Sequence, residues 1–138
     1  MILFEMFLLA SSFAALVFSW TVVWRKTNRL DAQFELSLLR KRVIDTFADR
    51  GWSQEEEIYS RLLRTLDKMI DRVGSFSIYH YIFFVIIARN HEEELKSHAG
   101  WVNSLYVSDN EECALFISGV RDTAGEIIFR YMGKTAFI

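Results

Sequence analysis

The feature that most constrains this fold is an uninterrupted apolar stretch near the N-terminus, running from Ile2 to Trp24. Its only charged side chain is Glu5, near one end. As a helix this stretch would be about 34 Å long, which is enough to cross a hydrocarbon core of roughly 30 Å. The sequence therefore predicts an all-α membrane protein with a single N-terminal transmembrane helix within residues 1–27.

Charge and aromatic residues at the end of this stretch predict its orientation. Trp20 and Trp24 lie one helical turn apart, and Arg25, Lys26 and Arg29 follow them. Tryptophan rings favour the headgroup layer, and positive charge favours the cytoplasmic side of a membrane. We therefore expect the N-terminus to lie outside and the rest of the chain to lie in the cytoplasm.

Two other interpretations of the apolar stretch stay open. A cleaved signal peptide usually carries positive charge before its apolar run, whereas the early charge here is the negative Glu5. A fully buried helix of a soluble domain is the second alternative, and apolar runs of this length are rare outside membranes. Both considerations favour the membrane span.

Small side chains recur every fourth residue within the predicted span, at Ser11, Ala15 and Ser19. A face of small residues lets a second helix approach closely in lipid. Small residues are also common in spans that have no such partner. We predict that this face packs against another transmembrane helix.

Composition limits the rest of the chain to one small helical domain. Of the 138 residues, about one hundred remain after the span. The chain has no proline, and its net charge of −2 does not suggest nucleic acid as a partner. Its single cysteine, Cys113, cannot form an internal disulfide and fits a reducing compartment.

Residues 28–74 have the pattern of two amphipathic helices joined at Gly51, which predicts an antiparallel cytoplasmic hairpin. Gly74 supplies the expected stop of the second helix. Three sets of apolar residues carry this prediction: Leu36, Leu39, Val43 and Phe47 on the first helix, an adjoining stripe of Leu30, Phe34 and Leu38, and Ile58, Leu62, Leu66, Ile70 and Val73 on the second.

The segment from Phe76 to Ala88 is apolar and aromatic but reaches only about 20 Å as a helix, which is short of a full span. In a soluble body it would be the central buried helix, or a buried strand. In a membrane it would be a short second span or a re-entrant helix. An excess of basic residues before it and of acidic residues after it is what a two-span hairpin would show. The single span is favoured because of length.

The remaining sequence predicts further helices within residues 75–138, which combine a hydrophobic central helix with a C-terminal helical segment. We expect the helix of residues 76–88 to continue through His98 and end near Gly100, followed by a strand-like connector over residues 101–107. Asp109, with Glu112 three residues later, predicts the N-cap of a last helix. Gly119 and Gly125 predict a break within that helix.

Few residues suggest chemistry. His91, Glu94 and His98 share a helical face, but their spacing matches no recognised metal motif, and a solvated face is the commoner case. His80 within an apolar run and Glu5 in the span are candidates for a proton or ion role, against the commoner structural roles. We find no phosphate loop, nucleophile elbow or paired carboxylates, and therefore predict no enzyme activity, cofactor or metal.

One family resemblance lies at the end of the predicted span. Ser19, Trp20, Thr21, Val22 and Val23, followed by Arg25 and Leu30, resemble the end of the first span in the proton-driven motor family of TolQ, ExbB and MotA. The resemblance covers residues 12–30 and implies an outside N-terminus with helices entering the cytoplasm. The later glycine-rich spans that surround the ion path in that family are missing, so its function is not carried over.

Apolar surface exceeds what so small a body can bury, which predicts that other chains cover part of it. We therefore predict a non-catalytic small subunit of a larger membrane protein complex, with a transmembrane packing helix and a cytoplasmic helical scaffold. Phe34, Leu38 and Trp52 are the expected contacts in the cytoplasm. The alternative is a pore-forming or membrane-perturbing effector that assembles with copies of itself. In either case the partners are membrane protein subunits or further copies, together with the lipid bilayer.

Overall fold

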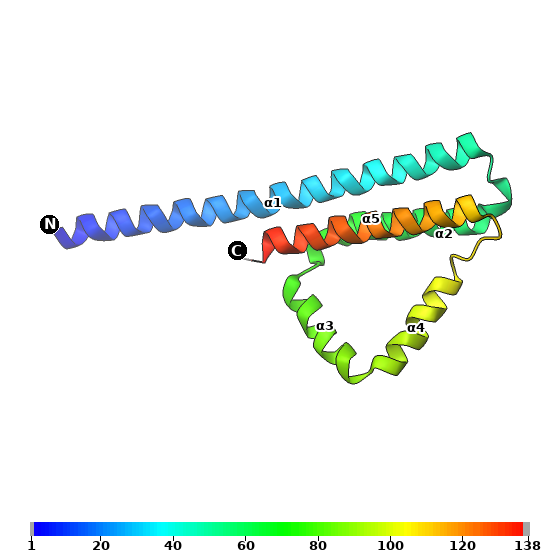
Figure 1. The fold of residues 1–138 in the computed structure, drawn as a ribbon. Coiled ribbons are helices and arrows are strands. Elements are labelled where there is room, and N and C mark those ends of the chain that lie inside the picture. Colours follow the sequence, from blue (N-terminus) through cyan, green and yellow to red (C-terminus); the bar gives the residue numbers. More distant parts are fainter. Residues whose placement is uncertain (1, 137–138) are drawn as a thin grey trace.

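The computed structural model describes residues 2–136, and every regular element within them is helical (Figure 1). This confirms the all-α prediction for the described residues. The five α-helices and two short 3-10 helices are α1 (Ile2–Arg50), η1 (Ser53–Glu55), α2 (Glu56–Arg72), η2 (Val73–Ser75), α3 (Ile78–Asn90), α4 (Glu92–Ser104) and α5 (Glu111–Thr135).

The longest element, α1, is a single helix of 49 residues. It continues without a break past Trp24, as expected of a sequence that has no glycine or proline in this region. It ends at Arg50 and is followed by Gly51, whose φ of 63° lies in the left-handed region that favours glycine. The apolar segment (residues 2–27) and residues 28–50 thus belong to one continuous rod.

Residues 28–50 of α1 pack with α2 and α5, and these three elements form what we call the helical body. Both α2 and α5 run antiparallel to α1 (Figure 1). The predicted stripe on α1 is confirmed, because all four of its members are buried. The core contains Ala32, Leu36, Leu39, Val43, Phe47, Leu62, Leu66, Val73, Cys113, Ile117, Val120, Ala124, Ile127, Ile128, Tyr131 and Met132.

Polar contacts at the edges of the helical body fix the alignment of its helices. The Arg40 guanidinium lies 2.6 Å from the Asp67 carboxylate, which joins α1 to α2. Arg130 lies 3.1 Å from Glu35, which joins α5 to α1. These pairs are partly exposed and stabilise the fold by at most about 1 kcal/mol each. A buried Leu, by contrast, contributes about 1.5–3 kcal/mol, so apolar packing dominates.

The helices α3 and α4 leave the helical body and form the two arms of a V (Figure 1). The chain bends by 110° between the helix that ends at Ser75 and α3. None of the residues of α3 is buried. The predicted central buried helix is therefore wrong for this segment: α1, α2 and α5 already fill the core. The alternative of a buried strand is also wrong, since Ile78–Asn90 is helical.

Two predicted boundaries in this region are wrong. The helix does not continue to His98, because His91 has φ −128° and ψ 41° and separates α3 from α4. Three glutamates occupy the first turn of α4, where negative charge favours a new helix start. The predicted strand-like connector is wrong as well, since Trp101 lies in the last turn of α4.

The last helix differs from expectation in its cap and its continuity. Its N-cap is Asn110, whose Oδ1 accepts a hydrogen bond from the Cys113 backbone N–H at 3.2 Å, so the prediction of Asp109 is wrong by one residue. The predicted break at Gly119 or Gly125 is also wrong, because α5 is continuous for 25 residues. Both glycines face open space. Their cost of about 1 kcal/mol each is smaller than the stabilisation from the buried face of α5.

Candidate interaction surfaces

Among the residues that the structure describes, the apolar segment (residues 2–27) has no buried residue and forms a hydrogen bond with α5 at its end, through Trp24. It belongs to the one helix of residues 2–136 that is long and apolar enough by itself to cross a membrane, and its most apolar part has no buried residue. Length and composition are equally compatible with a signal sequence. Glu5 and the small residues Ser11, Ala15 and Ser19 are all exposed, which leaves this face free.

The apolar segment ends where the C-terminal turn of α5 lies beside it. Trp24 Nε1 donates a hydrogen bond to the Lys134 carbonyl oxygen at 3.4 Å. The Trp24 ring stacks with Trp20, with ring centroids 6.2 Å apart. One turn further along α1, Asn28 is the first buried residue, and its Nδ2 has no hydrogen-bond partner among the described residues. Sequence reasoning missed Asn28, although it continues the buried pattern of α1 by one step of four.

The three residues expected to contact other chains lie in two different environments. Phe34 and Leu38 are 64% and 51% exposed on the outer side of α1. Trp52 is half-buried, and its ring packs edge-on to Phe47 with centroids 5.1 Å apart and also against Phe116. Trp52 therefore closes the end of the helical body, and Phe34 and Leu38 remain free for other contacts.

The helix α3 presents a second exposed apolar surface. Phe83, Phe84 and Ile86 are each more than half exposed. Apolar residues lie on all sides of α3, so the sequence pattern does not mark one side of the helix as the side that packs on the helical body. His80 is exposed on the first turn of α3, and Figure 1 places the N-terminal end of α1 far from α3, so Glu5 and His80 are not brought together.

The histidines and glutamates of α4 do not assemble a metal centre. His91 Nδ1 lies 3.5 Å from a Glu94 carboxylate oxygen, but His98 stacks on Trp101 with ring centroids 5.7 Å apart. Among residues 2–136, no three His, Cys, Asp or Glu side chains are placed to hold a metal ion together.

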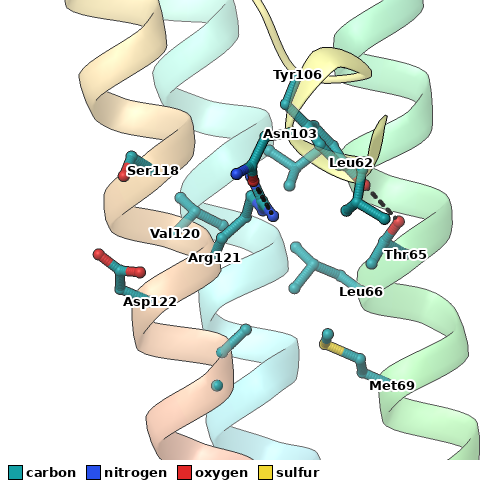
Figure 2. Close-up of a pocket in the computed structure, with 13 residues that line it drawn as sticks. Leu62, Thr65, Leu66, Met69, Asn103, Tyr106, Ser118, Val120, Arg121 and Asp122 are labelled. Atoms are coloured by element: carbon teal, nitrogen blue, oxygen red, sulfur yellow. Dashed lines mark hydrogen bonds between the residues drawn. The ribbon is translucent and has the colours of Figure 1, made fainter. Parts of the chain in front are cut away.

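A cavity of about 440 Å³ lies between α2, α5 and the C-terminal end of α4 (Figure 2). Arg121 spans part of it, with its guanidinium 4.7 Å from the centre of the Tyr106 ring and its Nη2 donating to Asn103 Oδ1 at 3.2 Å. The Tyr106 hydroxyl lies 2.9 Å from Thr65 Oγ1. The arginine and both hydroxyls already have partners within the chain, so they hold α4 in place.

The lone thiol, Cys113, lies fully buried at the start of α5. Burial raises the pKa of this thiol, and the negative Glu55 adds to the effect, while a hydrogen bond with Ser108 opposes it. A raised pKa disfavours the reactive thiolate. The arrangement therefore supports a structural role for Cys113.

Comparison with models of known protein families, with curated proteins and with solved structures finds no significant match. The resemblance of residues 12–30 to the proton-driven motor family therefore has no support from a family match.

Proposed function

We propose that this protein is a non-catalytic small subunit of a larger membrane protein complex, anchored by residues 2–27 and contributing a cytoplasmic helical scaffold. The observation that carries this proposal is the continuity of α1, which joins an apolar segment with no buried residue to a well-packed helical body. Such a rod holds a scaffold at a fixed position relative to a bilayer.

The exposed side of α1 supports the presence of partner chains. At 100° per residue, Ser19, Leu30 and Phe34 lie within about 60° of one another around the helix. Leu30 and Phe34 are both more than half exposed. The side of the rod that carries Ser19 in the predicted lipid region thus continues into the large apolar residues Leu30 and Phe34 beyond it, which is a surface that another helix can follow.

The orientation with the N-terminus outside rests on the basic residues beyond Trp24. Arg25, Lys26 and Arg29 follow the stacked tryptophans directly. Lys134, at the end of α5, lies beside Trp24 and adds a fourth cation at this level. The helical body would therefore face the cytoplasm, with its cationic end against the headgroups.

The test is purification of the tagged full chain in mild detergent, with the mass and protein composition of the particle measured together. Foreign proteins in fixed ratio to this chain are the expected result. Replacing Ala15 by Leu should reduce their recovery, since a bulky residue blocks close helix approach. A matched control is Phe13→Leu, which alters an exposed apolar residue without adding bulk to the small face. A chain that purifies alone as a monomer would contradict the proposal.

The exposed apolar α3 favours a second candidate, a pore or membrane-perturbing assembly of copies of this chain. In that case expression causes leakage, and Ile86→Asp abolishes the leakage because a charge in the inserting helix is costly. A subunit of a larger complex causes no leakage, and its partners remain bound when Ile86 is changed.

A further inference from the structure

We propose that α3 lies flat at the boundary between the cytoplasmic headgroups and the acyl chains of the same bilayer that α1 crosses, as a second, monotopic membrane contact. This inference rests on the proposed function, because it requires residues 2–27 to span the membrane. The occupant of the exposed α3 surface is thus lipid.

The position of α3 relative to α1 carries the first step. The C-terminal turn of α5 contacts both helices: the Lys134 carbonyl accepts from Trp24 Nε1 at 3.4 Å, and the Ala136 carbonyl accepts from the Tyr79 hydroxyl at 3.4 Å. Tyr81 also packs edge-on to Phe129 with ring centroids 5.8 Å apart. The first turn of α3 therefore lies at the end of the helical body that adjoins the last turn of the apolar segment.

The direction of α3 carries the second step. Because α2 runs alongside α1, its axis approximates the direction in which α1 crosses the membrane (Figure 1). The bend of 110° into α3 turns the chain close to a right angle from that direction. The helix α3 consequently runs nearly parallel to the membrane plane.

The chemistry of α3 carries the third step. Its first turn contains Tyr79, His80 and Tyr81, and it ends with Arg89 and Asn90. Polar or amphipathic groups at both ends keep both ends near headgroups. The apolar residues between them occupy all sides of the helix, so the middle of α3 is expected to enter the acyl boundary rather than to leave one side in water. A length of about 20 Å is too short to span.

A basic side chain of α1 lies against the helix turn before α3. The Arg29 side chain lies against Gly74, where a Cβ atom would approach its Nε to 2.9 Å. The absence of a side chain at residue 74 lets Arg29 lie close to the bend. Arg29 thus adds to the positive charge of Arg25 and Lys26 near α3, which favours anionic headgroups.

The test uses the full chain in vesicles of phosphatidylcholine and phosphatidylglycerol, with depth-dependent fluorescence quenching as the measurement. In a Cys113→Ala background, an environment-sensitive dye is attached at Phe83→Cys, at Val17→Cys in the apolar segment, or at Glu93→Cys on α4. Nitroxide groups attached near the headgroup or deep in the acyl chain quench the dye. We expect shallow nitroxides to quench the dye at position 83 about twofold more than deep ones. Position 17 should show the reverse order, and position 93 little quenching.

Ile86→Asp is then introduced into the chain that carries the dye at position 83. It should reduce the quenching of this dye to the level seen at position 93, while the melting temperature of the helical body stays unchanged. Strongest quenching of position 83 by deep nitroxides would overturn the flat placement in favour of deep insertion. No quenching at position 83 with normal quenching at position 17 would overturn lipid as the occupant and leave the proposed function standing. No quenching at position 17 would overturn both.

Discussion

The two halves of α1 belong to the same uninterrupted helix and have opposite environments. Residues 2–27 are more apolar, and none of them is buried. Residues 28–50 include many charged residues, yet this half of α1 contains six buried residues: Asn28, Ala32, Leu36, Leu39, Val43 and Phe47. Apolar content alone therefore does not decide what enters the core. The repeat of three or four residues does, because it places apolar groups on one side of the helix.

The largest difference between the two halves of α1 should appear when one leucine in each half is replaced by aspartate. Leu36 is fully buried and Leu16 is 70% exposed. Leu36→Asp should unfold the helical body, since an unpaired buried charge costs several kcal/mol. Leu16→Asp should leave the thermal unfolding transition of the body unchanged and reduce membrane insertion, at a cost of about 2.5–3.5 kcal/mol. Circular dichroism in detergent and flotation with vesicles measure the two outcomes. If both substitutions lowered the melting temperature equally, the claim that only residues 28–50 of α1 contribute to the core would be refuted.

A smaller contrast should separate buried from exposed leucines of the helical body. Leu66→Ala should lower the free energy of unfolding by about 2–5 kcal/mol, because the side chain is 1% exposed and a cavity remains. Leu38→Ala, at a leucine that is 51% exposed, should cost less than about 1 kcal/mol. Denaturant titration in detergent compares the two. A large loss at Leu38 would mean that this surface is already covered in the isolated chain.

The amphipathic helices could be predicted from the sequence, whereas the exposure of the apolar helix α3 could not. The stripe from Leu36 to Phe47 and the stop at Gly74 depend on local periodicity and on glycine, both of which are visible in sequence. Whether α3 is buried depends on how much room the other helices leave, which no local pattern reports. The break at His91 was missed because glutamate is also a good helix former in a helix interior, so the three glutamates after His91 fit a continuing helix as well as a new one.

The candidate interaction surfaces could be predicted from the sequence only in part. Phe34 and Leu38 follow a helical stripe and are exposed, and their role in binding stays a prediction. Trp52 packs beside Phe47 and is half-buried, and its contact with other chains stays a prediction. A lone tryptophan after a glycine gives no sign of which helix its ring will meet. Asn28 escaped notice because a buried amide looks like any exposed polar residue in sequence.

A pH effect should appear at Cys113, within the buried part of the molecule. Burial raises the pKa of its thiol, so the folded chain retains the neutral form longer than the unfolded chain does. The resulting stability is fully present below the unfolded pKa of about 8.5 and is lost as pH rises through the folded pKa. Alkylation should also be on the order of tenfold slower than in denatured chain. Cys113→Ala should lose this pH dependence, and rapid alkylation at neutral pH would contradict burial.

The smallest effect should arise where the two halves of α1 meet. Asn28→Leu removes a buried amide that has no partner among the described residues and should stabilise the helical body by up to about 1 kcal/mol. The neighbouring Thr27 is exposed, and Thr27→Leu should change stability by less than about 0.5 kcal/mol. A clear loss of stability in Asn28→Leu would show that the amide binds a group within the assembled protein. Thermal melting in detergent measures both variants.

The continuity of α1 also makes the helix a lever. Between Trp24 and Arg50 it has no glycine or proline that could absorb a bend. This part of α1 is about 40 Å long, so a tilt of about 10° at Trp24 would displace its far end by about 7 Å. In the proposed complex, a change in how neighbouring helices hold residues 2–27 would therefore move the whole helical body sideways at Gly51.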